Sequence, residues 1–162
     1  MAVRKALVVL SNASSGELPT GDVLDLGSRT YVRAYASAGQ ATSASMALVA
    51  FGGVSDGSDV FANNTLTVPA GGAGIWAIDV GVVITGLAAN EYVNCSLYIN
   101  GAERAKVGEQ NAVAGTLALT AGFHLRLAVG DLVTVQMRTG TAGRTIYGDV
   151  NNQVTTFTAY KL

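Results

Sequence analysis

The sequence predicts an all-β fold, an antiparallel sandwich of short strands, from three observations. Twenty glycines are spread along the 162 residues, and helix signals are nearly absent. The apolar runs are dominated by β-branched residues, which favour strands. Several of these runs alternate apolar with polar residues and end at Gly, Asn or Asp, as half-buried strands do before a turn. Many short strands of this kind indicate a sandwich or jelly roll.

The clearest strand signals lie on either side of Gly130 and Asp131. In the segment 123–129, Phe, Leu and Val alternate with His124, Arg126 and Ala128. In the segment 133–138, two valines and a methionine alternate with polar residues. Alternation on both sides of a Gly-Asp turn predicts an antiparallel hairpin with one solvent-exposed face.

The middle of the chain predicts two more strands and a second hairpin. The segment 75–84 is apolar apart from Asp79, so we expect a central strand buried on both faces. An unpaired buried carboxylate is costly, and Asp79 is therefore expected to pair with an arginine or to lie at a subunit boundary. The strand 92–99 ends at Asn-Gly, a strong hairpin signal, which makes 102–107 the return strand.

The remaining strands are weaker predictions. The segment 154–162 is rich in β-formers, and shorter candidates precede it at 31–36, 46–51 and 65–68. No internal repeat is visible, which argues against a propeller or a solenoid.

Residues 1–30 differ from the rest of the chain. A short strand over 3–10 is followed by a polar stretch that contains a proline and isolated apolar residues. We interpret 1–30 as an N-terminal attachment arm and 31–162 as the β domain; an ordinary first strand with a long loop is the alternative. The arm residues expected to dock on another protein are Val8, Leu10, Leu18, Pro19, Val23 and Leu24.

Composition indicates self-association. Charged residues make up 13% and hydrophobic ones 49%, which is too apolar for a disordered chain and poor in charge for a monomer's surface. Part of the surface is expected to be covered by copies of the chain or by another protein, unless Ala, Gly and Thr simply cover it. With a net charge of −1 and scattered basic residues, no nucleic-acid partner is expected.

No membrane partner is expected either. No apolar stretch approaches the roughly 20 residues that cross a bilayer. The apolar run 6–10 is too short for a signal peptide, so synthesis in the cytoplasm is expected.

The residues give no sign of catalysis. His124 and Cys95 are the sole histidine and cysteine, and no nucleophile motif surrounds them. No enzyme activity, metal or cofactor is expected. Asp56 and Asp59 supply oxygens of the kind calcium binds, although a turn is the better interpretation. Surface loops that could bind a partner are expected at Asp56, Asp59, Arg144 and Tyr147.

Four segments together resemble the tumour-necrosis-factor-like jelly roll, most closely its complement-globular-head branch. A proline turn leads into an aromatic-bearing strand at 69–76, a strand ends in Asn-Gly at 97–101, and a Gly-Asp turn opens an alternating strand at 130–137. The last match is the strand with Thr156, Phe157, Ala159 and Tyr160. The resemblance covers 45–162, but Ala159 replaces a usual glycine, and Ile75 with Trp76 stands where two aromatics are usual.

This resemblance implies a jelly roll of about ten strands that forms a homotrimer around a three-fold axis. It also implies that Tyr98, Phe157 and Tyr160 contribute to the trimer interface.

The N-terminal sequence MAVRKALVVLSNASSGELPTGDVL is similar to the start of small bacteriophage virion proteins. That similarity implies a virion protein attached to the particle through its N-terminus. Two roles are open: a capsid decoration protein (a cement protein or short head fibre) bound to the major capsid protein or another virion protein, and a tail-fibre tip that binds a host-surface glycan or protein. The absence of heptads and shaft repeats favours the first.

Overall fold

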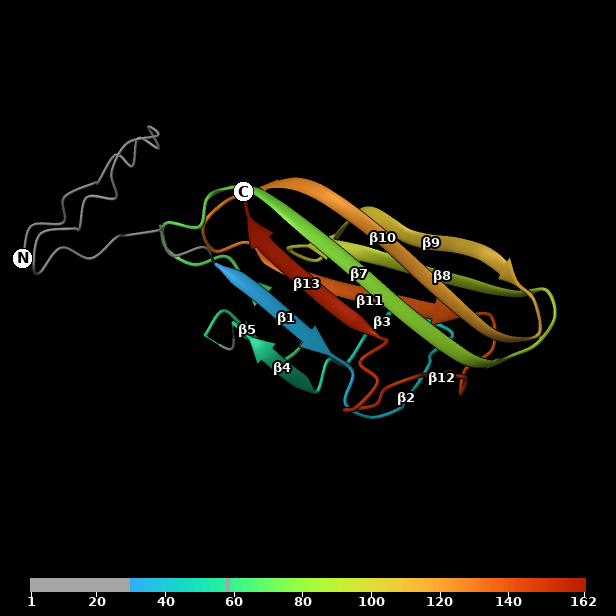
Figure 1. Cartoon of the computed structure of the whole chain (residues 1–162). Coiled ribbons are helices and arrows are strands. Elements are labelled where there is room, and N and C mark those ends of the chain that lie inside the picture. Colours follow the sequence, from blue (N-terminus) through green and yellow to red (C-terminus); the bar gives the residue numbers. More distant parts are fainter. Residues whose placement is uncertain (1–29, 58) are drawn as a thin grey trace, which may run out of the picture.

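Two antiparallel sheets pack face to face in the computed structural model, which describes residues 30–57 and 59–162 (Figure 1). These residues form thirteen strands and no helix, and therefore contain no helix long and apolar enough to cross a membrane. The predicted all-β class and the antiparallel sandwich are confirmed. The predicted arm, residues 1–30, lies outside the described residues except for Thr30.

Sheet A, which faces the viewer in Figure 1, is built around one long central strand. Its strands are β4 (Gly53–Asp56), β1 (Tyr31–Tyr35), β13 (Thr156–Lys161), β7 (Gly74–Leu87), β10 (Gly115–Leu127), β12 (Thr145–Ile146) and β2 (Gln40–Ala41). The main order is β4-β1-β13-β7-β10, and β12 takes over from β13 beside the second half of β7.

Sheet B lies behind sheet A in Figure 1. Its strands are β5 (Phe61–Ala62), β6 (Thr65–Thr67), β11 (Leu132–Thr139), β8 (Glu91–Ile99), β9 (Ala102–Ala112) and β3 (Ala47–Leu48). They follow the order β5-β6-β11-β8-β9, and β3 pairs with the far end of β11.

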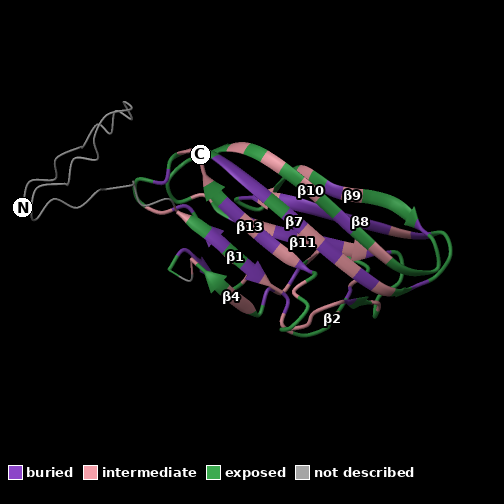
Figure 2. Ribbon diagram, in the orientation of Figure 1, coloured by how far each residue is buried: buried purple, intermediate pink, exposed green. Residues whose placement is uncertain are grey.

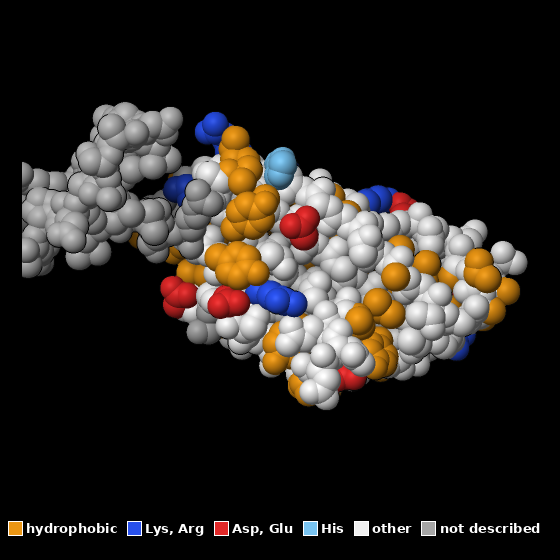
Figure 3. Space-filling model, in the orientation of Figure 1, with side chains coloured by type: hydrophobic (Ala, Val, Ile, Leu, Met, Phe, Trp, Pro, Cys, Tyr) orange, Lys and Arg blue, Asp and Glu red, His pale blue; other side chains and the backbone are white. Residues whose placement is uncertain are grey.

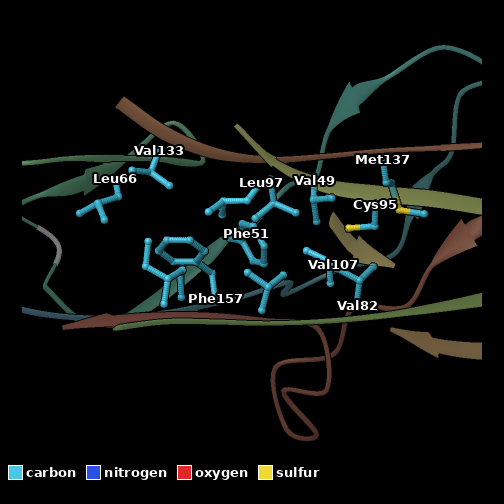
Figure 4. Close-up of a cluster of buried hydrophobic side chains, with 14 of the residues drawn as sticks. Val49, Phe51, Leu66, Val82, Cys95, Leu97, Val107, Val133, Met137 and Phe157 are labelled. Carbon is cyan, nitrogen blue, oxygen red and sulfur yellow. The ribbon is translucent and has the colours of Figure 1, made fainter. Parts of the chain in front are cut away.

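The core fills the space between the sheets. Along β1 and β7, buried residues alternate with more exposed ones, as the two-residue period of a strand dictates (Figure 2). Figure 4 shows side chains from both sheets meeting in this space. Phe51, Phe61 and Phe157 form an aromatic cluster with ring centroids 5.4–6.1 Å apart, and the buried Trp76 donates its indole N–H to the Gly72 carbonyl at 2.8 Å.

The hairpin predicted at Asn-Gly is confirmed. β8 and β9 pair on either side of Asn100 and Gly101, whose φ angles are 52° and 78°. Two successive residues with positive φ make the type I′ turn whose twist matches that of the two strands, and Asn-Gly is the pair that adopts it at least cost.

The hairpin predicted at Gly130 and Asp131 is wrong. Both strands exist, but β10 pairs with β7 in sheet A while β11 pairs with β8 in sheet B. The turn therefore carries the chain from one sheet to the other. Alternation reports one buried face in each strand and does not say which strand lies beside it. Asp131 fixes the crossover by accepting hydrogen bonds from the Ala128 N–H and the Asn100 side chain, both at 2.8 Å.

Several strand boundaries also differ from the prediction. The segment 75–84 is central but is not buried on both faces within one chain, because Ile75 and Asp79 are exposed on the outer side. Of 46–51, only Ala47 and Leu48 form a strand. The sequence patterns missed the short strands β2, β4, β5 and β12 and the first eight residues of β10.

Candidate interaction face

The outer face of sheet A presents its side chains in regular rows across the strands. One row runs from Tyr31 through Tyr160 and Ala77 to His124. The next row runs from Arg33 through Thr158 and Asp79 to Gly122, and a third from Tyr35 through Thr156 and Gly81 to Thr120. Directly paired residues share a face of an antiparallel sheet, so these twelve residues, two of them glycines, face the same side.

Small residues leave the middle of this face open. Ala77, Gly81 and Gly122 lie on β7 and β10 and present little or no side chain to solvent. Two adjoining hollows of about 250 and 410 Å³ lie over them, and both are lined by Asp79 and Gly122. A Cβ on Gly122 would approach the Asp79 carboxylate to 2.7 Å. The glycine therefore leaves room for the carboxylate to lie across β10.

Large apolar side chains lie exposed at the end of the face where Tyr160 lines one of the hollows. Tyr31, Ile75 and Tyr160 are 39%, 46% and 36% exposed. Figure 3, which views this face, shows hydrophobic side chains gathered near the C-terminal end of β13, and mostly uncharged surface along the rest of the sheet. Exposed aromatic and aliphatic groups beside a floor of small residues are typical of a surface that another protein covers.

The outer face of sheet B has a different character. Here Asn94 donates to the Tyr92 hydroxyl at 3.2 Å, and Ser96 donates to Asn94 at 2.9 Å and to Glu103 at 3.1 Å. The Arg138 guanidinium lies 5.1 Å from the centre of the Tyr92 ring. Most polar groups of this face thus bind one another, although the buried Arg138 Nε has no hydrogen-bond partner among the described residues.

The structure separates the three residues predicted for the trimer interface. Tyr160 lies exposed on the outer face of sheet A, and Tyr98 lies half-buried on the outer face of sheet B. The prediction for Phe157 is wrong, because its ring is 1% exposed and packs in the core against Phe51 and Phe61. Phe157 and Tyr160 occupy one strand but point to opposite sides of the sheet.

The predicted binding loops lie at opposite ends of the sandwich. Asp56 and Asp59 are exposed near the start of β7 and line a hollow of about 440 Å³ with Thr30 and Tyr31. The Gly57 carbonyl accepts hydrogen bonds from the N–H groups of Val60 and Phe61, as in a turn. Among the described residues, no group of three or more His, Cys, Asp or Glu side chains is arranged to hold a metal ion.

Arg144 and Tyr147 belong to the other end, where β7 finishes. Arg144 forms an ion pair with the buried Glu91 at 2.9 Å, and Glu91 also accepts from the N–H groups of Ala88 and Thr141. Burial raises the pKa of Glu91, but these hydrogen bonds outweigh burial and lower the pKa below its ordinary value. The Tyr147 hydroxyl donates to Asp149 at 3.2 Å. Arg144 is therefore engaged in holding loops together.

The six arm residues predicted to attach to a particle, Val8, Leu10, Leu18, Pro19, Val23 and Leu24, lie outside the described residues. Their role stays a prediction.

Cys95 and His124, the cysteine and histidine that a nucleophile and a base would require, lie on different sheets. Cys95 is buried between the sheets, and burial raises the pKa of its thiol to about 12. His124 is exposed on the outer face of sheet A. A thiol of such high pKa is not a reactive nucleophile near neutral pH.

Sequence patterns predicted some features of the outer face of sheet A and missed others. Asp79 was expected to pair with an arginine or to lie at a subunit boundary; it forms no ion pair among the described residues and lies in the middle of the open face, so the second alternative stays a prediction. Gly81 and Gly122 were missed, although a glycine inside a strand signals a close approach by another group. The alternation of Leu117, Leu119 and Ala121 with the smaller residues Thr116, Ala118 and Thr120 was the signal for the missed part of β10.

The comparisons with known proteins agree with the fold. No protein-family model and no curated protein matches the chain by sequence. Among solved structures, the chain is similar to the globular domain of zebrafish complement 1qA protein (TM-score 0.62, 15% identity, 82% of this chain and 97% of that one).

Two further structures show the same similarity. They are Eiger TNF from S. frugiperda (TM-score 0.60, 9% identity, 83% and 92% covered) and murine APRIL (TM-score 0.58, 13% identity, 83% and 99% covered). The chain therefore has the jelly-roll fold of tumour necrosis factor and complement 1q, as the sequence resemblance predicted.

Proposed function

We propose that this chain is a non-catalytic structural protein of a bacteriophage particle, which forms a homotrimer through the outer face of sheet A. Its predicted role is capsid decoration: residues 1–30 attach to the major capsid protein or to another virion protein, and the jelly roll projects from the surface. The likeness to solved structures supports the fold alone. The virion assignment is supported by the N-terminal resemblance.

The outer face of sheet A is the observation that carries self-association. Its exposed Tyr31, Ile75 and Tyr160 lie at one end of the face, and Tyr160 lines one of the two hollows there. Burying such side chains against a second copy gains about 25 cal/mol for each Å² of apolar surface removed from water. Burying the outer face of sheet B against a second copy would gain less free energy, because its polar groups already bind one another.

A binding role agrees better than catalysis with the chemistry of the described residues. The Cys95 thiol is buried and has a raised pKa, and His124 lies on the other sheet. In a trimer, three arms that dock together gain from multivalency, since one bound arm raises the effective concentration of the other two. This mechanism needs no ligand, metal or cofactor.

Two measurements test the proposal. Sedimentation equilibrium of the full chain is expected to give three times the chain mass, and a monomer would contradict the trimer. Full-length protein is then mixed with particles that lack it, beside the Leu18→Asp/Leu24→Asp variant. We expect the wild type to cover the capsid in electron micrographs, while the variant stays trimeric and unbound.

The tail-fibre alternative predicts a different outcome of the same experiment. The protein would then occur only at the tail, and purified trimer would adsorb to host cells and compete with infection. Equal particle binding by wild type and variant would contradict attachment through the arm.

A further inference from the structure

Asp79 lies in the middle of the open face of sheet A and forms no ion pair with another described residue. The ion pairs among the described residues are Lys106 with Glu109 and Arg144 with Glu91. The Asp79 side chain is exposed over Gly122 and lines both central hollows. The carboxylate thus occupies a space that also has room for another charged group.

Arg33 is the basic residue of the same row. The row runs Arg33, Thr158, Asp79 and Gly122 across four strands. Arg33 is exposed and belongs to neither of the two ion pairs, although Asp56 is its direct neighbour on β4. Two strand spacings separate Arg33 from Asp79, or about 10 Å between their Cα atoms.

In a ring of identical chains, rotational symmetry can place this row of one chain against the same row of its neighbour. A rotation moves a residue around the axis but leaves its height along the axis unchanged. When the axis runs along the strands of sheet A, each row of one copy therefore meets the same row of the next copy. In a closed ring, different parts of one face meet, so the Arg33 end of the row contacts the Asp79 end of the neighbouring row.

We propose that Arg33 of one copy binds Asp79 of the neighbouring copy, three times around the ring. This inference rests on the proposed trimer and names the contact that sets its register. A guanidinium binds a carboxylate through two parallel N–H···O bonds, which fixes orientation as well as distance. The missing side chain of Gly122 gives the guanidinium space to reach the carboxylate.

The other basic groups of the face, Arg126 and His124, lie in different rows from Asp79. Arg126 is paired with Ile75, and His124 with Ala77, so both belong to rows nearer the start of β7. At the same height as Asp79, sheet A offers Arg33 alone as a cation. Arg126 is therefore a matched control: it has the same charge, the same sheet and the same outer face, but lies in a different row.

A charge swap tests the contact in the full-length chain. We expect Asp79→Arg alone and Arg33→Asp alone each to weaken the trimer by about tenfold or more, as the loss of a close charge pair does. The double variant Asp79→Arg/Arg33→Asp is expected to recover most of the loss. The control double variant Asp79→Arg/Arg126→Asp is expected to recover none. Sedimentation equilibrium measures association, and far-UV circular dichroism checks folding.

A cysteine pair gives an independent readout. In the Arg33→Cys/Asp79→Cys variant, the two thiols of one chain lie too far apart for a disulfide, which needs Cα atoms within about 7 Å. Cys95 is buried with a raised pKa and stays out of the reaction. Mild oxidation is therefore expected to give covalent trimers on a denaturing gel, and each single variant is expected to give at most dimers.

The outcomes separate this inference from the proposed trimer. A trimeric wild type whose charge swap is not restored, and whose cysteine pair does not cross-link, overturns the Arg33–Asp79 contact and leaves the trimer standing. A monomeric wild type overturns both. Recovery in the Arg126 control as well as in the Arg33 swap also overturns the contact, because net charge and not a specific pair would then control association.

Discussion

The two outer faces of this sandwich are both formed by antiparallel sheets but differ in their chemistry. On sheet B, Tyr92, Asn94 and Ser96 are joined by hydrogen bonds, and Ser96 is completely buried beneath its neighbours. On sheet A, glycine and alanine form the floor, and Asp79 lies over it without an ion-pair partner in the described part of the chain.

The difference shows on which face the polar groups are satisfied within a single chain. Polar groups that satisfy one another can face water at little cost, and the interactions keep a surface rigid. A face with hollows, exposed tyrosines and few charges gains free energy when a second surface fills it. The contrast therefore supports the proposed assembly through sheet A, and four predictions compare the parts of the molecule.

The largest effect is expected on the free energy of unfolding, in a comparison of the two sides of β13 in sheet A. Phe157→Ala removes a buried ring from the aromatic cluster and should lower the free energy of unfolding by about 3–5 kcal/mol. Tyr160→Ala, three residues away on the outer side of the same strand, should change the unfolding of the isolated chain by about 0.5 kcal/mol or less. Urea unfolding at low protein concentration measures both. Similar losses in the two variants would contradict the assigned side-chain directions.

The next effect compares the two faces directly. Tyr160→Glu places a charge among the exposed apolar groups of sheet A, and we expect self-association to weaken by about 2 kcal/mol, or roughly 30-fold. Tyr98→Glu makes the same change on the outer face of sheet B and should leave association unchanged. Analytical ultracentrifugation checks both variants. A stronger effect at Tyr98 would move the interface to sheet B.

A smaller effect is expected from the polar network. Asn94→Ala removes the acceptor of Ser96 and the donor to Tyr92, and should lower the free energy of unfolding by about 1–2 kcal/mol. Thr158→Ala, in the middle of the A face, should change it by about 0.5 kcal/mol or less. Thermal unfolding followed by circular dichroism compares the pair. If Asn94→Ala has no effect, the B face is not held together by its own hydrogen bonds.

The smallest effect is expected in the dependence of stability on low pH. Hydrogen bonds from Ala88, Arg144 and Thr141 outweigh burial and lower the pKa of Glu91, while those from Ala128 and Asn100 lower the pKa of Asp131. Both ionised groups therefore stabilise the folded state at neutral pH, and this contribution is lost as the pH falls below about 4.

The Asp131→Asn variant isolates the second of these two groups. Its urea midpoint should fall less between pH 7 and pH 3 than that of the wild type, because one of the two groups no longer titrates. An equal fall in both proteins would mean that Asp131 adds nothing to the acid sensitivity.

Sequence patterns predicted each long strand at least in part, because a strand with one buried side repeats every two residues whatever its neighbours are. The Asn-Gly hairpin was also predictable, since the turn depends only on the backbone preferences of two adjacent residues. The short strands β2, β4, β5 and β12 were not, because segments this short are fixed by the partners that they pair with. Among the predicted interface residues, Tyr160 faces outward and Phe157 faces the core. The two-residue period already excluded one shared face, because residues three apart in a strand point to opposite sides, but it did not say which of the two is buried.

The sequence by itself determined the fold class, the order of the long strands and a chain poor in charge. Each of these follows from composition or from interactions between residues close in the sequence. Only the tertiary structure decided that Gly130 and Asp131 lead from one sheet to the other, and that Arg33, Asp79 and Gly122 share one row. Such relations depend on which strands lie side by side, and strand pairing joins residues far apart in the chain through backbone hydrogen bonds that any sequence can make.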